Sequence, residues 1–309
     1  MELRVESYRN AFGQKLVELG EKNRHVIVLD ADVGDSTKTA LFRERFPTRF
    51  FNVGISEQDM IGIAAGLSIE GFIPIATTFS MFVLKAWEQI RNTIARDNMN
   101  VKIVASHGGL SDFADGSSHQ CLEDIALMRT IPGMKVVVPA DAQSTRGLLE
   151  QAVKNKSPVY FRIGRDYCLR IYENEDQVIL GKANVLREGD DLTLVACGLM
   201  VPFALTAHEK LLKKGVKATV VDAHTIKPLD PSLIRTCRRS GKVVTIEEHN
   251  VVGGLGSAIC ETLSEYGVKV KRIGVNDKFG ESSEDYRKLL KKFALDEDSI
   301  FEQINSFVG

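Results

Sequence analysis

The sequence has few of the features that define disulfide-rich, metal-binding or membrane proteins. Five of its 309 residues are cysteines, an odd number of thiols spread along the chain without C-x-x-C spacing. We therefore expect reduced thiols, as in a cytoplasmic protein. No apolar run approaches the length of a transmembrane helix, and the charged residues 1–6 do not resemble a signal peptide. These absences predict a cytosolic location and no membrane partner.

The chain also lacks an excess of charge of either sign. It has 40 basic and 41 acidic residues, and its formal net charge is −1. A protein that binds nucleic acid or an anionic membrane through its overall field needs a clear basic excess. The composition therefore predicts no nucleic-acid partner, although it is compatible with a local basic patch at a phosphate site.

Short apolar runs and helical patterns alternate along the first half of the chain. Residues 142–153 have helical spacing, with Asp141 as the expected N-cap. Runs that suit buried strands lie at residues 26–29, 73–76, 101–104, 136–138 and 159–163. This rhythm predicts a parallel sheet, whose ligands gather at the carboxyl ends of the strands. The residues expected there are Asp32, Glu57, Phe79, His107 and Arg162.

A second α/β unit is predicted because 309 residues exceed what one core usually fills. We expect a first domain over residues 1–170, a linker over 171–190 and a second domain over 191–309, with strands at 192–196, 218–222 and 243–246. The glycine-rich run 253–258 is an incomplete nucleotide loop and predicts a tight turn into a helix. His224 and His249, at strand ends, are expected to make local hydrogen bonds.

One carboxylate, Glu57, stands where a short extended run gives way to a helix. Ser56 is a candidate N-cap, and small residues at Gly62 and Gly66 would let another backbone or a flat ligand approach closely. Taken alone, Glu57 is more typical of an acid that complements the positive end of the helix dipole.

Two aromatic residues, Phe79 and Phe82, lie three residues apart where another strand gives way to a helix. Such a pair by itself is usually part of a core, since Phe mostly contributes buried apolar area. Together with Glu57, however, the pair suits a flat heteroaromatic cofactor with one ring nitrogen facing the acid.

This combination resembles the pyrimidine-binding domain of thiamine diphosphate enzymes. The resemblance rests on Gly-Ile-Ser-Glu-Gln at 54–58, Ala-Ala-Gly-Leu at 64–67 and Thr-Phe-x-x-Phe at 78–82. Three further blocks narrow the resemblance to transketolases. They are Ser-His-Gly-Gly at 106–109, Ala-Asp-Gly-Ser-Ser-His-Gln at 114–120 and the segment 122–134. The resemblance covers nearly the whole chain but only the second part of a full-length transketolase. It implies two consecutive parallel-sheet α/β domains, the pyrimidine-binding domain and the transketolase C-terminal domain.

A Gly-Asp-Gly motif, with which this class holds a divalent cation and the cofactor diphosphate, is absent from the sequence. The nearest strings, at 34–36 and 189–191, lack the second glycine. Without an ion or a nest of backbone donors a diphosphate has no strong site. The resemblance therefore implies a split transketolase, in which an N-terminal transketolase subunit supplies the diphosphate-binding domain and Mg²⁺ or Ca²⁺. Sites in this family form between subunits, so homodimerisation of this chain is also expected.

The resemblance implies a role for each matching residue. Glu57 would share a proton with the aminopyrimidine of thiamine diphosphate and so promote proton loss from its thiazolium carbon, while Phe79 and Phe82 would stack on the pyrimidine. For the sugar phosphate, the residues that match the phosphate-binding positions are Arg9, Ser36 and Arg162, with His107 nearby. Asp115 would bind a sugar hydroxyl, and His119 would lie near the reacting carbons. Taken singly, these residues are more typical of ion pairs, a turn or a helix cap.

The implied activity is transfer of a two-carbon ketol unit between sugar phosphates, as in the pentose phosphate pathway, by the two-chain complex only. Residues 117–118 are Ser-Ser where many full-length relatives have Pro-Thr, which leaves the acceptor preference open. Two alternatives remain. One is another thiamine enzyme half, such as the β subunit of a 2-oxoacid dehydrogenase or part of a deoxyxylulose-phosphate synthase, against which Gln120 and Glu123 argue. The other is a non-catalytic assembly subunit, against which the retained Glu57 argues.

Overall fold

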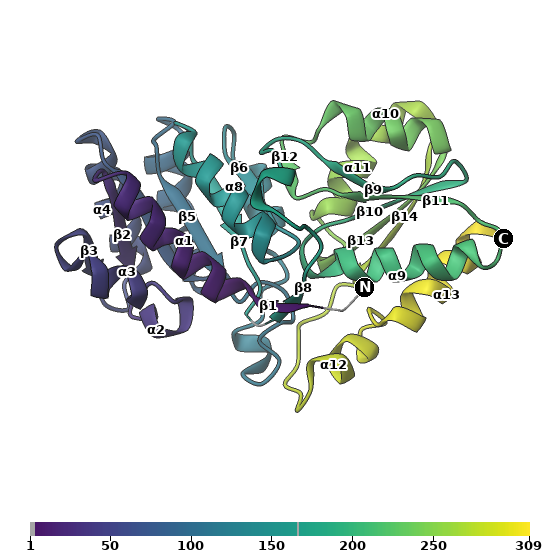
Figure 1. Cartoon of the computed structure of the whole chain (residues 1–309), viewed down its shortest axis with the longest axis horizontal. Coiled ribbons are helices and arrows are strands. Elements are labelled where there is room, and N and C mark those ends of the chain that lie inside the picture. Colours follow the sequence, from purple (N-terminus) through teal and green to yellow (C-terminus); the bar gives the residue numbers. More distant parts are fainter. Residues whose placement is uncertain (1–3, 166) are drawn as a thin grey trace.

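The computed structural model describes residues 4–165 and 167–309, which form two α/β units in succession (Figure 1). Each unit is built on a mostly parallel sheet. This confirms the predicted fold class. Within the described residues no helix is both long enough and apolar enough to cross a membrane.

The first sheet has seven strands in the order β12-β6-β7-β5-β4-β2-β3. Its parallel strands are β2 (Val26–Asp30), β3 (Phe50–Asn52), β4 (Ile73–Phe79), β5 (Lys102–Ser106), β6 (Lys135–Val137) and β7 (Val159–Arg162). Helices cover both faces, so most of these strands are buried throughout, which explains why they read as continuous apolar runs. All five predicted strands are confirmed.

Two sets of helices cover the faces of this sheet. On one face α1 (Tyr8–Lys22) and α8 (Ala142–Lys154) share a hydrophobic cluster, while α4 (Glu57–Ile69) and α7 (Asp124–Thr130) contribute to a second cluster. Asp141 caps α8 as predicted, since its carboxylate accepts the Ser144 backbone N–H at 2.8 Å. In return, the Ser144 hydroxyl accepts the Asp141 backbone N–H at 2.9 Å. The shorter helices are α2 (Gly34–Thr37), α3 (Ala40–Arg45), α5 (Ser80–Val83) and α6 (Trp87–Gln89).

The second sheet has the order β14-β13-β10-β11-β9. Its parallel strands are β10 (Leu192–Ala196), β11 (Ala218–Asp222), β13 (Lys242–Asn250) and β14 (Lys269–Val275). Its helices are α9 (Val201–Leu212), α10 (Pro231–Ser240), α11 (Leu255–Leu263), α12 (Tyr286–Lys292) and α13 (Glu297–Val308). The predicted strands are confirmed, β13 being longer than expected, and the run 253–258 turns into α11 as predicted.

The segment predicted as a linker contains regular structure that the pattern did not show. Strand β9 (Asn184–Arg187) pairs antiparallel with β11, so the later part of 171–190 belongs to the second sheet. Upstream, β8 (Tyr167–Leu169) pairs with β1 (Val5–Ser7), and β12 (Thr225–Lys227) from the second half pairs with β6 of the first sheet. Short edge strands of mixed polarity carry little periodic signal, which is why they were missed. The domain boundaries themselves stay a prediction.

A buried polar network joins the two units. Arg162, at the end of β7, donates its Nε to Asp124 Oδ2 at 2.8 Å and its Nη2 to the backbone carbonyl of Glu248 at 3.0 Å. The Glu248 carboxylate, on β13, accepts the Tyr286 hydroxyl at 2.7 Å and the Leu110 N–H at 3.0 Å. Desolvation by burial raises the pKa of Glu248 from 4.5 to about 7. The junction between the units therefore contains an acid whose charge is costly.

We expect Glu248→Gln to stabilise the chain at pH above about 8 and to change its stability little near about pH 5. Because the folded-state pKa is raised, protonation favours the folded chain, and that stability is lost as the pH rises from 4.5 through about 7. The amide accepts the same hydrogen bonds without charge, which is worth about 1–3 kcal/mol at high pH. Urea unfolding across this pH range measures the difference, and an equal loss of stability at both ends would contradict it.

Candidate active site

The predicted site residues lie along one edge of the first sheet, where its parallel strands end. Phe79 is the last residue of β4, His107 follows β5 directly, and Glu57 is the first residue of α4, after β3. This edge is where a parallel sheet collects its ligands. The structure therefore brings these three predicted residues to one side of the first unit.

Glu57 is a buried carboxylate held at the start of a helix. It is 3% exposed, and its Oε2 lies 3.5 Å from Nζ of Lys85, which is itself exposed. Ser56 occupies the N-cap position as predicted, but its side chain makes no capping hydrogen bond. The preceding turn is secured by Asn52, whose Oδ1 accepts the Gly54 N–H at 2.9 Å and whose Nδ2 donates to Asp32 at 2.8 Å. An ion pair with an exposed lysine stabilises a carboxylate only weakly. The Glu57 carboxylate can therefore exchange this partner for a ligand.

Lys85 links this acid to an aromatic cluster, because its Nζ also lies 5.6 Å from the centroid of the Phe82 ring. The rings of Phe79 and Phe82 are stacked, with centroids 5.1 Å apart and an interplanar angle of 17°. Phe79 is only 8% exposed and also stacks on His107 at 3.7 Å, whereas Phe82 is half-buried. His119 meets Phe82 edge-on at 5.3 Å. Phe82 is therefore the ring with surface left to cover a flat ligand, and Phe79 supports it.

The two predicted histidines differ in setting. His107 is buried at φ +61°, and its Nδ1 lies 2.8 Å from the Ser106 hydroxyl. Desolvation, and then the positive charges of Arg9 and Arg165, lower the pKa of His107 to about 3, so its imidazole is neutral. His119 is half-buried, with Nδ1 2.9 Å from the Ser118 hydroxyl. A neutral, oriented imidazole can exchange hydrogen bonds with a polar substrate atom.

The predicted phosphate-binding residues fall into two groups. Arg9 donates its Nη1 to the backbone carbonyl of Ser36 at 2.8 Å, so these two predicted residues are in contact. Arg162 is different, because it is 5% exposed and its guanidinium is directed at Asp124 and backbone carbonyls. The structure does not bring Arg162 together with Arg9 and Ser36. Its phosphate role stays an untested prediction that this geometry does not favour.

Arg165, which sequence reasoning missed, has the more suitable placement. Its side chain is 28% exposed, with Nη1 3.3 Å from Asp112 Oδ1, and its charge acts on His107 together with that of Arg9. Arg162 is the last residue of the buried strand β7, whereas Arg165 lies beyond its end. A preference for an arginine in the loop after a buried strand over the last residue of that strand would have favoured Arg165.

Asp115 and His119 share one loop, which connects β5 to α7. Asp115 is exposed and precedes a 3-10 turn over Gly116–Ser118, which is followed by His119 and the buried Gln120. Neither His224 nor His249 joins this loop. Their ring nitrogens contact Thr225 and the Asn250 carbonyl, as expected of local hydrogen-bonding residues.

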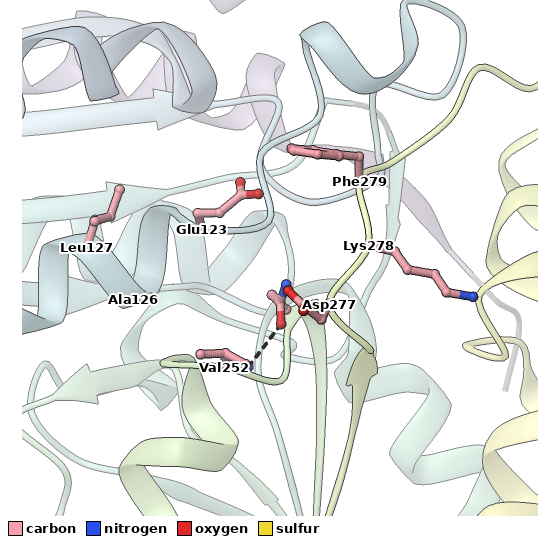
Figure 2. Close-up of a pocket in the computed structure, with 8 residues that line it drawn as sticks. Glu123, Ala126, Leu127, Val252, Asp277, Lys278 and Phe279 are labelled. Carbon is pink, nitrogen blue, oxygen red and sulfur yellow. Dashed lines mark hydrogen bonds between the residues drawn. The ribbon is translucent and has the colours of Figure 1, made fainter.

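A cavity of about 420 Å³ lies elsewhere, between α7 and the loops after β13 and β14 (Figure 2). It faces both units and is lined by Glu123, Ala126, Leu127, Asn250, Val252, Asp277, Lys278 and Phe279. None of the predicted site residues lines it. We therefore assign no catalytic role to this cavity.

Two family models match this chain. The model of the transketolase pyrimidine binding domain matches residues 6–168, and that of the transketolase C-terminal domain matches residues 181–300.

Individual proteins show the same likeness. A Methanocaldococcus jannaschii protein, provisionally named a transketolase C-terminal section, is 46% identical over 96% of this chain and 94% of its own length. A 6-deoxy-6-sulfo-D-fructose transketolase subunit from Clostridium sp. is 39% identical over 95% of this chain and 92% of its own length. A solved split-gene transketolase, an inactive β4 tetramer, superposes with a TM-score of 0.89 at 45% identity and covers 98% of both chains.

A longer relative matches this chain over only part of its own length. The 1-deoxy-D-xylulose-5-phosphate synthase of Desulforudis audaxviator is 36% identical over 97% of this chain, which spans 48% of that enzyme.

The residues present fit one end of thiamine diphosphate. A buried carboxylate beside a half-exposed phenyl ring suits an aminopyrimidine, which needs an acid at a ring nitrogen and an apolar face. For the other end, residues 4–165 and 167–309 contain no group of three or more His, Cys, Asp or Glu side chains able to hold a metal ion. The buried Glu57 and the half-exposed Phe82 therefore fit the pyrimidine half of the cofactor.

We expect Arg162→Met and Arg165→Lys to separate stability from ligand binding. Loss of Arg162 leaves Asp124 buried without its partner and should lower the free energy of unfolding by about 3–5 kcal/mol. Arg165→Lys keeps a cation beside Asp112 but loses the planar fork, so a ligand with a phosphate group should bind about tenfold more weakly, with little change in stability. Urea unfolding and calorimetry measure these effects, and equal destabilisation of both variants would contradict the distinction.

Proposed function

Because this chain belongs to the transketolase family, we propose that it is the pyrimidine-binding and C-terminal subunit of a split transketolase. It transfers a two-carbon ketol unit from a ketose phosphate to an aldose phosphate with thiamine diphosphate. The observation that carries this proposal is the buried Glu57, joined to Phe82 through Lys85, with Arg9, His107 and Arg165 on the same edge of the sheet.

The roles of the residues follow from their settings. When bound, the cofactor supplies a nucleophilic carbon that accepts the two-carbon unit. Glu57 holds a proton against the ring nitrogen of the aminopyrimidine, and its burial excludes water from that hydrogen bond. Phe82 covers the apolar face of the ring, an interaction on the order of 1 kcal/mol beyond burial.

The sugar phosphate is held by a different set of groups. Arg9 and Arg165 neutralise the phosphate, with Ser36 beside Arg9. His107 stays neutral, and the contact between its Nδ1 and the Ser106 hydroxyl holds the orientation of the ring. From their loop, Asp115 accepts a sugar hydroxyl and His119 lies at the aromatic cluster, near the reacting carbons.

A partner chain completes the enzyme in this proposal. An N-terminal subunit supplies the diphosphate-binding domain and the Mg²⁺ or Ca²⁺, for which the described residues contain no ligand cluster. Copies of this chain also associate with one another, and the chain alone is inactive. Support comes from the subunit and section names of the relatives and from the β4 assembly of the structural neighbour, which is inactive.

The names of the relatives do not agree on which sugars are the donor and acceptor substrates. The Clostridium subunit is named for 6-deoxy-6-sulfo-D-fructose, whereas the longer relative is a 1-deoxy-D-xylulose-5-phosphate synthase. That likeness favours synthesis of a deoxyxylulose phosphate as the second candidate function. The chain covers 92% of the transketolase subunit but 48% of the synthase, which favours the split transketolase. Comparing ketol transfer with decarboxylation of pyruvate by the reconstituted complex separates the two candidates.

We expect Glu57→Gln to lower ketol transfer by about 100-fold or more, because the amide cannot share a proton with the aminopyrimidine. The measurement is the rate of transfer between sugar phosphates by this chain with its N-terminal subunit, thiamine diphosphate and Mg²⁺. Glu70→Gln, on an exposed acid at the other end of α4, is the matched control and should keep full activity. Undiminished turnover by Glu57→Gln, or turnover by wild-type chain without the N-terminal subunit, would overturn the proposal.

A further inference from the structure

A segment of the second unit lies against the loop that carries Asp115 and His119. We call residues 276–285, between β14 and α12, the strap, and residues 110–120 the site loop. Figure 2 shows the start of the strap, with Lys278 and Phe279, running beside the first unit. The two segments are more than 150 positions apart in the sequence, so their contact is decided by the packing of the units.

Hydrogen bonds join the strap to two separate points of the site loop. The Ser283 backbone N–H donates to the Phe113 carbonyl at 2.8 Å. Near the other end, the Gln120 side chain donates to the Glu281 carbonyl at 2.9 Å and to the Asp112 carbonyl at 3.1 Å. The bonded points at Phe113 and Gln120 flank both Asp115 and His119.

Glycines let the two segments approach more closely than any side chain would allow. A Cβ on Gly280 of the strap would overlap the Oε1 of Gln120. A Cβ on Gly116 of the site loop would overlap the hydroxyl of Ser282, and Gly116 also has φ +78°. Such fit at two places indicates a specific contact.

The second unit also holds the start of the site loop. Glu248 accepts the Leu110 N–H and the Tyr286 hydroxyl through the same carboxylate oxygen. Tyr286 is the first residue after the strap, and Lys292 of the same helix pairs with Glu281. The strap is therefore anchored beside the loop that it contacts.

The hydrogen-bond partners of the Asp115 and His119 side chains lie within the site loop itself. Asp115 is exposed and interacts with Asp112, while the His119 ring contacts the adjacent Ser118 and the edge of Phe82. Their placement toward a substrate therefore depends on the backbone of the site loop. Glu57, Phe79 and Phe82 lie on α4, β4 and α5, which the strap bonds described above do not involve.

We propose that the strap is a positioning element for the sugar, acting through Gln120 and Phe113 on the loop that carries Asp115 and His119. The C-terminal domain thereby sets the affinity for the sugar phosphate without touching it, and its strap makes none of the hydrogen bonds described above to the elements that carry Glu57, Phe79 and Phe82. This inference rests on the proposed function. A purely structural contact would instead change stability, cofactor affinity and sugar affinity together.

The first test is Gly280→Ala in the complex of this chain with its N-terminal subunit, thiamine diphosphate and Mg²⁺. The added methyl group displaces Gln120, so the KM for the sugar phosphate acceptor should rise about tenfold. The affinity for thiamine diphosphate should stay within about twofold of wild type. Glu284→Ala is the matched control, because it removes a strap side chain that is 91% exposed, and it should leave both values unchanged.

The second test needs no activity and uses the whole isolated chain. Hydrogen–deuterium exchange of peptides from residues 110–120 should be faster in Gly280→Ala and in Gln120→Ala, while peptides from β4 and α4 keep the wild-type rate. If the wild-type complex transfers no ketol unit, the proposed function fails, but this exchange experiment still decides whether the strap orders the loop.

Two outcomes overturn the proposal. One is an unchanged KM together with unchanged exchange of residues 110–120 in both variants. The other is a parallel loss of thermal stability, cofactor affinity and KM, which indicates a structural contact only. Gln120→Ala adds no atoms and removes the hydrogen bonds of this side chain to Glu281 of the strap and to Asp112 of the site loop, so it tests the same contact if Gly280→Ala does not fold.

Discussion

The buried ion pair between Arg162 and Asp124 is the interaction around which the two units meet. A guanidinium at this depth is costly unless it is paired and hydrogen-bonded, and here Nε donates to Asp124 while Nη2 donates to the carbonyls of Cys121 and Glu248. The Tyr160 hydroxyl also donates a hydrogen bond to the Asp124 carboxylate. These partners come from the end of β7, the start of α7 and β13, so satisfying one charge aligns three elements from two units.

In this arrangement the two groups of candidate site residues are supported by different parts of the chain. Groups suited to a flat cofactor stand on α4, β4 and α5 of the first unit, whereas Asp115 and His119 stand on a loop that the second unit holds at three points. Rigid strands and helix ends position a cofactor well, but a loop needs support from outside itself. The C-terminal domain supplies that support.

The departure at residues 117–118 can be understood in the same terms. Pro fixes its own backbone angle, so a Ser-Ser pair gives up some intrinsic rigidity in the site loop. Ser118 keeps a hydroxyl, which lies 2.9 Å from Nδ1 of His119 and can hold the orientation of the ring. The strap contacts on either side replace part of the lost rigidity with tertiary contacts.

Local patterns and remote contacts contributed differently to what could be predicted. The strands, the capping of α8 by Asp141 and the place of Glu57 at a helix start follow from residues a few positions apart, so the sequence by itself determined them. Tertiary structure alone decided that Arg162 faces inward while Arg165 lies with Arg9 and His107, that β9 and β12 join their sheets, and that the strap meets the site loop. The reason is physical: an edge strand, a buried charge or a glycine contact depends on what packs against it, and those partners are remote in the sequence.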